Sequence, residues 1–547
     1  MGKMKTMKRF IYGIMAIWML ALPSCQSDLL EENPKSFLTP ENFYQSSSDA
    51  FAGLMGIYAL ISDKTLYGSY LSQESYLGTD IAYYRKNSGG LHYYANHLMT
   101  NTSGNLQTTW QQAYKTIYAC NLYIESITEK APIAEDEKNR FIAEATFIRG
   151  LVYFELARIY GGIPLITSIT PVSELQIPRN TLEEVYKQVE TDLLFAKQHL
   201  PWITEMSDGD HPRASKNAVL GILTRVYITM AGNPLNDQSK WAAASATAKE
   251  LIDLGYHNLH DNYNQVWLNV KDDVYDLHES IWEIGYTAGD LGNNLGTFNG
   301  IPSSKGPNGE ESKTVGGGYS FVKSTLTMRK YYGEDGNGYD KNLPDSRYHW
   351  NCVAYKLDGT NKPTLKDGEI VEQSEWALTK FRKNSSNGAY HYNKNGLNWV
   401  VLRYADILLM YAEAENELNG AGRSAEANQA LTTIRQRALR TINEDGSFVQ
   451  ANDQPIEEAN YNYDYSTMDQ ETFRQFIRDE RARELAGEGV RRWDLVRWGI
   501  LYETVKSLDG VEPKGYCWKN IQPYHVLFPI PQQEIDLNPM LKQNTGY

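Results

Sequence analysis

Apolar residues recur every three or four positions over most of this 547-residue chain, which predicts amphipathic helices. A first stripe lies at residues 51–58, and later stripes lie at residues 141–159, 219–251 and 402–438. The later stripes are ended or interrupted at Gly161-Gly162, Gly232, Gly255 and Gly420. Helix pairs that mix small and large residues in this way follow the tetratricopeptide pattern. We therefore expect a mostly α-helical fold, with long insertions because the pairs are unevenly spaced.

Two segments in the second half of the chain interrupt the helical pattern. Residues 285–320 hold ten glycines and few aliphatic side chains, and residues 331–398 are rich in Gly, Asn, Tyr and Trp. They predict loops and a few short strands, and loops on a rigid scaffold often carry recognition. We expect an N-terminal helical region, residues 41–280, and a C-terminal region, residues 281–547, whose insertion faces a ligand.

The start of the chain has the features of a secretory signal that ends in a cysteine. Four basic side chains precede a short apolar run and the sequence Leu22-Pro23-Ser24-Cys25. The run is shorter than the roughly 20 residues that cross a bilayer, so it predicts a signal peptide over residues 1–24. The cysteine resembles the lipidated residue of a bacterial lipobox, which makes Cys25 the lipid attachment site and residues 25–40 a polar tether. The alternative is an ordinary signal peptide followed by a chance cysteine.

Charge and cysteine content exclude several classes of function. The formal net charge is −14, and it is near −18 once the four basic residues of the signal peptide are removed. Nucleic acid would demand a basic face, so no nucleic-acid partner is expected. Cys120, Cys352 and Cys517 are far apart in sequence, so neither a disulfide framework nor a cysteine zinc site is predicted. No second apolar run approaches transmembrane length.

Residues 477–499 are dense in charge, and spacings of three and four residues put opposite charges on one helix face. Two interpretations compete: catalytic carboxylates, or an interhelical salt-bridge network that sets the packing of the last helices. We favour the network, because structural ion pairs imitate active sites. The chain has no nucleophile elbow, no His-Glu-x-x-His and no P-loop, and no enzyme activity is expected.

Residues 335–340 hint at a calcium loop, because oxygen-bearing side chains alternate there. Tyr339 replaces the third donor, and Asp340 replaces the turn glycine. A Gly-rich turn is the better interpretation, so no metal and no other cofactor is predicted.

Three blocks in the last third of the chain carry a resemblance to a known family. They are LRYADILLMYAEA at residues 402–414, IRDERAREL at 477–485 followed by GVRRWDLVRWG at 489–499, and LFPIP at 527–531 followed by QNTGY at 543–547. With Gly161-Gly162-Ile163-Pro164 and Asp345-Ser346-Arg347, these blocks closely resemble the SusD/RagB family of Bacteroidetes outer-membrane lipoproteins. The resemblance covers essentially the whole mature chain.

The resemblance implies a SusD-like fold built on four tetratricopeptide-like helix pairs. It implies a glycan-binding lipoprotein, anchored in the outer membrane and facing the cell exterior, with no catalysis. It also implies a SusC-like TonB-dependent transporter as partner, over which the lipoprotein sits as a lid. RagB-type members bind peptides instead, so peptide capture stays open. A secreted glycosidase and a purely structural subunit of the transporter are two further hypotheses.

A sugar presents an apolar face of C–H groups and a rim of hydroxyls, so its site needs rings to stack on and polar groups to bond the rim. The 38 tyrosines and 12 tryptophans of the chain suit such a surface. Two regions combine these residue types, and family members use loops at these two places along the chain. The candidates are Asp80, Tyr83, Tyr84, Arg85, Tyr93, Tyr94 and Asn96 in the early region, and Tyr286, Phe298, Tyr319, Trp350 and Trp376 in the middle region. For each aromatic taken singly, packing between helices is the alternative.

Overall fold

The computed structural model is mostly helical, with a few short strands, and this confirms the predicted fold class. The signal peptide, Cys25 and the tether lie outside the residues that it describes. The described residues are 43–74, 77–85, 90–174, 176–207, 210–302, 318–340, 343–357, 363–366, 369–370, 375–383, 394–439, 465–512 and 517–547. Among them, none of the helices combines the length and the apolar character needed to cross a membrane.

The helices fall into a long and a short class, and the strands are all short. The long helices are α3 (Ser47–Ile61), α5 (Gly104–Lys130), α6 (Glu135–Tyr160), α7 (Leu182–His199), α8 (Lys216–Ala231), α9 (Lys240–Asp253), α10 (Tyr263–Asp272), α14 (Tyr404–Asn419), α15 (Ala425–Ala438) and α16 (Gln470–Glu484). The short helices are α4 (Gly90–Ala95), α11 (Leu295–Phe298), α12 (Leu326–Tyr331), α13 (Ser346–Asn351), α17 (Arg491–Arg497), α18 (Leu501–Lys506), α19 (Cys517–Asn520) and α20 (Gln532–Leu537). The strands are β1 (Ala82–Tyr84), β2 (Ser280–Ile284), β3 (Val322–Ser324), β4 (Cys352–Val353), β5 (Leu365–Lys366), β6 (Glu369–Ile370), β7 (Ala377–Leu378) and β8 (Trp399–Arg403).

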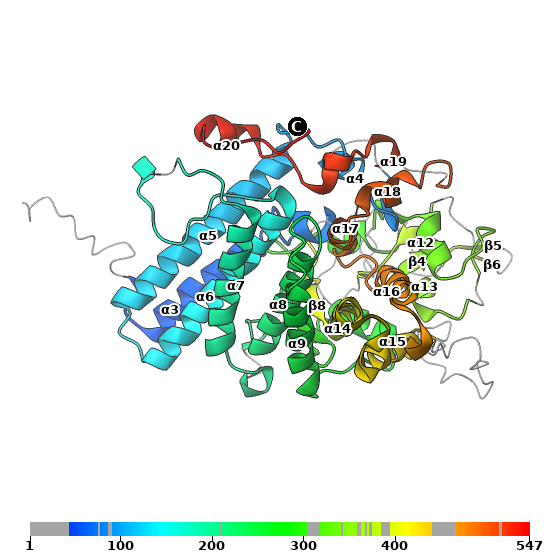
Figure 1. Ribbon diagram of the computed structural model, residues 1–547, viewed down its shortest axis with the longest axis horizontal. Helices are drawn as coiled ribbons and strands as arrows, with labels where there is room; N and C mark the ends of the chain where they lie inside the picture. Colours follow the sequence, from blue (N-terminus) through cyan, green and yellow to red (C-terminus); the bar gives the residue numbers. More distant parts are fainter. Residues whose placement is uncertain are drawn as a thin grey trace, which may run out of the picture.

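Long helices that follow one another in sequence pack side by side. Helix α6 packs on α5 and α7, α8 packs on α7 and α9, and α14 packs on α9 and α15. Figure 1 shows α3 and α5–α7 at one end of the molecule, α12, α13 and the short strands β4–β6 at the other, and α8, α9 and α14 between them. The stripes at residues 141–159, 219–251 and 402–438 fall on α6, on α8 and α9, and on α14 and α15, so these helices are confirmed.

Side-chain caps and glycines set the ends of these helices. Ser215, Ser424 and Asp469 each accept a hydrogen bond from a backbone N–H in the first turn of α8, α15 and α16. Gly161 and Gly420 follow α6 and α14 with φ of 76° and 58°, where a residue with a Cβ would be strained. Local sequence therefore specifies where these helices stop and start.

The predicted stripe at residues 402–438 is wrong at its first residue. Leu402 lies in β8, which pairs antiparallel with β2. Its side chain lies against Gly221 of α8, where an added Cβ would stand 1.9 Å from Leu402 Cδ2. The leucine is therefore apolar because a strand packs closely on a helix, and not because of helical periodicity.

A four-stranded antiparallel sheet joins segments that are far apart in sequence. Its strand order is β1-β3-β7-β4, and the register places Tyr83 opposite Lys323, Lys323 opposite Ala377, and Ala377 opposite Val353. The face of the sheet that bears Ala82, Tyr84 and Val322 packs on a small core, which is distinct from the large core between the helices. The sheet thus brings the early site region against the middle insertion.

Candidate functional site

The pairing of β1 with β3 continues one residue beyond both strands. The Arg85 N–H donates to the Phe321 carbonyl at 2.9 Å. Residues directly opposite one another in antiparallel strands point to the same face of the sheet. Tyr83, Lys323 and Ala377 therefore form one row across the sheet, and the candidate site is built around that row.

An aromatic cluster lies where this pairing ends. The rings of Tyr319 and Phe321 are stacked, with centroids 4.9 Å apart and planes 8° from parallel. Phe298 and Tyr84 contact the Phe321 ring, with centroids 5.3 and 5.8 Å away. Tyr84 is buried and Tyr319 is 43% exposed, so the cluster is anchored in the core and presents one ring to solvent. A ring supported from behind suits stacking on the C–H face of a sugar.

An ion pair lies beside the aromatic cluster. Nε of Arg85 is 3.1 Å from Oε2 of Glu375, and the Arg85 side chain is 55% exposed. Tyr83 stands two residues before Arg85 on the same face and is buried. Burial, followed by the Glu375 carboxylate, raises the pKa of the Tyr83 hydroxyl well above its ordinary value, so it stays protonated. Of the predicted residues, those that the sheet brings together are Tyr83, Tyr84, Arg85, Phe298 and Tyr319.

Asp80 belongs to the framework of the protein, which corrects its place in the predicted site. Its buried carboxylate accepts hydrogen bonds from Nε and Nη2 of Arg491 at 2.9 and 2.5 Å. The Tyr331 hydroxyl donates to the same carboxylate at 2.8 Å. The residue ties the segment before β1 to α17 and α12, and its oxygens face the protein itself.

Trp350 and Trp376 are also buried, and their polar and ring contacts are internal. Trp350 Nε1 donates to the Lys380 carbonyl at 3.2 Å, and the Arg382 guanidinium lies 3.6 Å from its ring centroid. The Arg329 guanidinium lies 4.1 Å from the Trp376 ring centroid. These indoles support the sheet, so the prediction that they contact a ligand is replaced by a packing role.

The remaining candidates divide into buried and exposed residues. Tyr94, Asn96 and Tyr286 are buried. Tyr94 packs on Phe528, with ring centroids 4.7 Å apart. Tyr93 is 49% exposed and lies on α4, which packs beside β1. Tyr93 therefore stays a candidate for ligand contact, and the three buried residues serve packing.

Sequence reasoning missed three residues of this site: Phe321, Lys323 and Glu375. The alternating positions of Tyr319, Phe321 and Lys323 hint at a strand, but β3 begins only at Val322, so the spacing did not specify how these side chains lie. Glu375 gave no signal, because its partner Arg85 lies far away in sequence and only the fold brings the two together.

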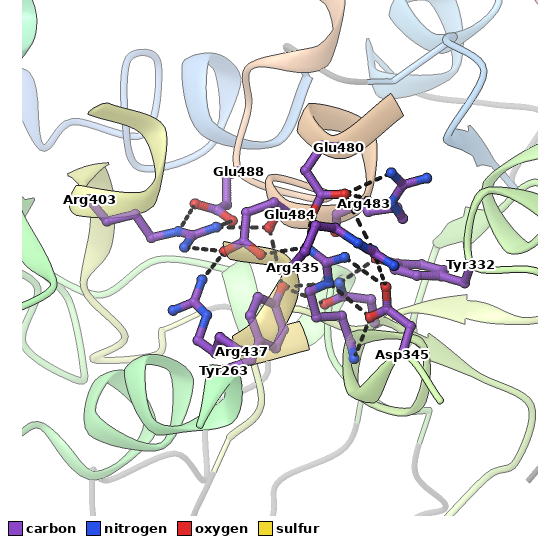
Figure 2. A network of polar contacts seen from close by, with 12 residues as sticks. Tyr263, Tyr332, Asp345, Arg403, Arg435, Arg437, Glu480, Arg483, Glu484 and Glu488 are labelled. Atoms are coloured by element: carbon purple, nitrogen blue, oxygen red, sulfur yellow. Dashed lines mark hydrogen bonds and ion pairs between the residues drawn. The ribbon is translucent and has the colours of Figure 1, made fainter. Parts of the chain in front are cut away.

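The charged block at residues 477–499 contributes to a buried ion-pair network, shown in Figure 2. Glu484 of α16 is its centre, with Nη1 of Arg347 and of Arg403 at 2.7 and 2.6 Å from its oxygens. Arg437 also contacts this carboxylate. All four side chains are buried, and the arginines come from α13, β8 and α15. The network therefore holds α16 to three other elements.

The carboxylates of this network stay charged. Burial alone would raise their pKa values, but the neighbouring guanidinium groups, Arg347 foremost, lower the pKa of Glu480 to about 2. Arg437 and Arg403 lower the pKa of Glu484 well below its ordinary value. A buried, fully paired carboxylate neither reaches a substrate nor exchanges a proton near neutral pH. The network interpretation of the charged block is confirmed.

Two family models match the chain. The SusD family model matches residues 278–547, and a model described as "Starch-binding associating with outer membrane" matches residues 38–228. The chain belongs to the SusD/RagB family. Arg403, Glu480 and Glu484 lie in the sequence blocks that carried the resemblance, and all three are network residues. The sequence blocks that carry the family resemblance therefore contribute to the packing of this SusD/RagB protein.

Relatives of this SusD/RagB protein align along nearly its whole length. SusD-like protein P25 from Formosa agariphila is 28% identical over 567 residues, covering 96% of this chain and 97% of that protein. A SusD homolog from Bacteroides thetaiotaomicron has a TM-score of 0.80 at 29% identity, covering 93% of this chain and 98% of that one. A laminarin-binding SusD-like protein shares the fold, with a TM-score of 0.68 at 23% identity, covering 92% of this chain and 100% of that one.

The segment at residues 335–340 forms a bend stabilised by its own side chains. The Asn337 N–H and its Nδ2 group both donate to the Asp335 carboxylate at 2.8 Å. Over the described part of the chain, no three His, Cys, Asp or Glu side chains are grouped so as to hold a metal ion.

Acidification is expected to destabilise this SusD/RagB protein through the network. Glu480, with a pKa of about 2, and Glu484 bind protons less readily in the folded chain than in the unfolded one, where a glutamate has a pKa of about 4.3. Their contribution to stability is fully present above that value and is lost as the pH falls toward about 2. The urea midpoint of unfolding should therefore fall between about pH 5 and about pH 2.5. A constant midpoint over this range would contradict the prediction.

Proposed function

We propose that this protein captures an oligosaccharide at the cell surface and delivers it to a SusC-like TonB-dependent transporter in the outer membrane. The match to the starch-binding, outer-membrane-associated model supports a glycan ligand and this location. The observation that carries the proposal is the exposed Tyr319 ring, stacked on Phe321 beside the Arg85–Glu375 ion pair.

The chemistry of this site matches the two sides of a sugar. The apolar C–H face of a pyranose ring stacks on Tyr319, which Phe321 holds in place, so little conformational entropy is lost on binding. The guanidinium of Arg85 donates to ring hydroxyls, and the protonated Tyr83 hydroxyl is a further group within the same face. Stacking supplies affinity, and the polar groups fix the orientation of the sugar.

Peptide capture of the RagB type is the second candidate function. Strand β1 is at one edge of the four-stranded sheet, and an extended peptide can add a strand to such an edge. A supported aromatic ring next to a guanidinium is a better match for sugar, because a bound peptide strand would rely on backbone hydrogen bonds. We therefore place the glycan first.

In this proposal, the lipid on Cys25 tethers the protein to the outer membrane. A tether of about 15 residues reaches at most about 50 Å, so it confines the protein to the membrane surface. Confinement raises the effective concentration of the protein at the mouth of the transporter. The same tether leaves the protein free to open and close over the transporter as a lid.

Replacing Tyr319 by alanine tests the glycan site. The change removes the exposed ring of the stack while leaving the half-buried Phe321 and the buried Tyr84 in place, so the fold should be retained. We expect about a tenfold loss of affinity for the best-bound glycan, in line with the loss of one stacking contact. Isothermal titration against laminarin, starch and other polysaccharides, alongside peptide mixtures, measures this.

Tyr118→Ala is the matched control, because Tyr118 is 54% exposed on α5, on the helical part of the protein. It should leave glycan affinity unchanged. If the wild-type protein binds peptides and no glycan, the RagB-type function replaces the proposed one. If Tyr319→Ala and Tyr118→Ala bind glycan equally well, the site lies elsewhere.

A further inference from the structure

A buried lysine lies in the middle of the candidate site and forms no ion pair with a carboxylate of the described residues. Lys323 is 2% exposed, and over the described residues its Nζ has one hydrogen bond, to Oγ of Ser320 at 3.4 Å. No ion pair joins Lys323 to a carboxylate within the described part of the chain. Burial lowers its pKa to about 8, so the ammonium is still mainly protonated at neutral pH. Over the described residues, the strand face therefore carries an ammonium that is not paired directly with a carboxylate.

Lys380 is a buried lysine that does pair with a carboxylate. Its Nζ is 2.9 Å from a carboxylate oxygen of Glu488, and it donates to the Glu484 carbonyl at 3.1 Å. An unpaired buried ammonium is costly, because desolvation is not offset by an opposite charge. Lys323 thus differs from Lys380 in having no ion-paired carboxylate among the described residues, which leaves its ammonium available to an anionic ligand.

The Arg85–Glu375 ion pair closes over Lys323. Lys323 stands between Tyr83 and Ala377 in the row across the sheet. Arg85 lies two residues after Tyr83 and Glu375 two residues before Ala377, so both share the face of Lys323. Their contact at 3.1 Å therefore spans the central strand, and both charges act on Lys323, Arg85 lowering its pKa and Glu375 raising it.

We propose that the captured glycan carries an anionic group, a uronate carboxylate or a sulfate ester, which displaces Glu375 and is bound by Arg85 and Lys323. The inference rests on the proposed glycan capture and names the ligand class of that site. Arg85 and Lys323 stand against the single carboxylate of Glu375, while the nearby Glu512 and Arg329 offset one another, so the local charge is positive in a chain whose net charge is −14. Such a local field attracts an anion, and the guanidinium suits both oxyanions through paired N–H donors. The Tyr319 ring then holds the sugar that bears the charge.

The test compares matched neutral and acidic glycans on three variants. Polygalacturonate and its methyl ester differ only in the carboxylate, and sulfated carrageenan oligosaccharides with their desulfated forms test the sulfate. We expect wild-type protein to bind the acidic members at least about tenfold more tightly. Lys323→Met should remove that preference while the fold is retained, because methionine fills the same space without a charge. Glu375→Gln should strengthen acidic binding, because it frees Arg85.

Lys115→Met, at an exposed position of α5, is the control and should leave the preference for acidic glycans unchanged. The matched pair for which the wild-type protein prefers the acidic member shows whether the bound group is a carboxylate or a sulfate. Equal binding of neutral and acidic members, or an unchanged preference in Lys323→Met, overturns the inference while glycan capture stands. Failure of the wild-type protein to bind any glycan overturns the proposed function and this inference with it.

Discussion

Replacing Glu484 by glutamine is expected to lower the free energy of unfolding by about 3 to 5 kcal/mol. The carboxylate lies between Arg347, Arg403 and Arg437, which are all buried. Glutamine has nearly the same shape but no charge, so three guanidinium groups would lose their shared counter-charge. Loss of one partner leaves buried charge uncompensated, which costs far more than loss of a surface ion pair. Urea denaturation at pH 7 measures the change.

Glu471→Gln is the matched control for this substitution. Glu471 lies on the same helix, its side chain is 71% exposed, and it pairs with Arg474 near the surface. Solvent screens such a pair, so this variant should unfold at nearly the wild-type urea concentration. Equal destabilisation by the two glutamine variants would mean that the helix, and not the network, is the origin of the effect.

The helices and the network could be predicted because their signals are local in sequence. Ser424 caps α15 and Gly420 ends α14, and both positions are recognisable from the chain alone. The spacing of charges along α16 likewise predicted an ion-paired helix face. The partners of those charges could not be predicted, because Arg347 and Glu484 lie 137 residues apart and meet only in the folded chain.

The exposure of single aromatic residues could not be predicted either. Tyr93 and Tyr94 are neighbours in sequence and in residue type, yet Tyr93 is exposed while Tyr94 packs on Phe528 near the end of the chain. The register that places Tyr83 opposite Lys323 depends on pairing between distant segments. A shift of one residue would turn every side chain of the strand to the other face, and nothing local fixes that choice. The two regions of the site could thus be named, but not which residues line it.

Replacing Asp80 by asparagine is expected to lower the free energy of unfolding by about 3 to 5 kcal/mol and to leave the glycan affinity of the folded protein unchanged. The carboxylate binds the buried guanidinium of Arg491 with two hydrogen bonds and accepts a third from Tyr331. Asparagine keeps the volume but removes the charge, so Arg491 would be left buried without its counter-ion. Urea denaturation and isothermal titration on the same preparation separate stability from binding.

Asp253→Asn is the control for Asp80→Asn, because its ion pair with Lys249 lies at the surface of α9 and should contribute little to stability. Asp80 lies three residues before Tyr83, so this substitution distinguishes a structural role of Asp80 from direct contact with the ligand. A stable Asp80→Asn variant with impaired glycan binding would return Asp80 to the site and contradict the assignment made from its burial. An unstable variant with unimpaired binding would show that Asp80 fixes the start of the strand to α12 and α17 and makes no contact with the ligand.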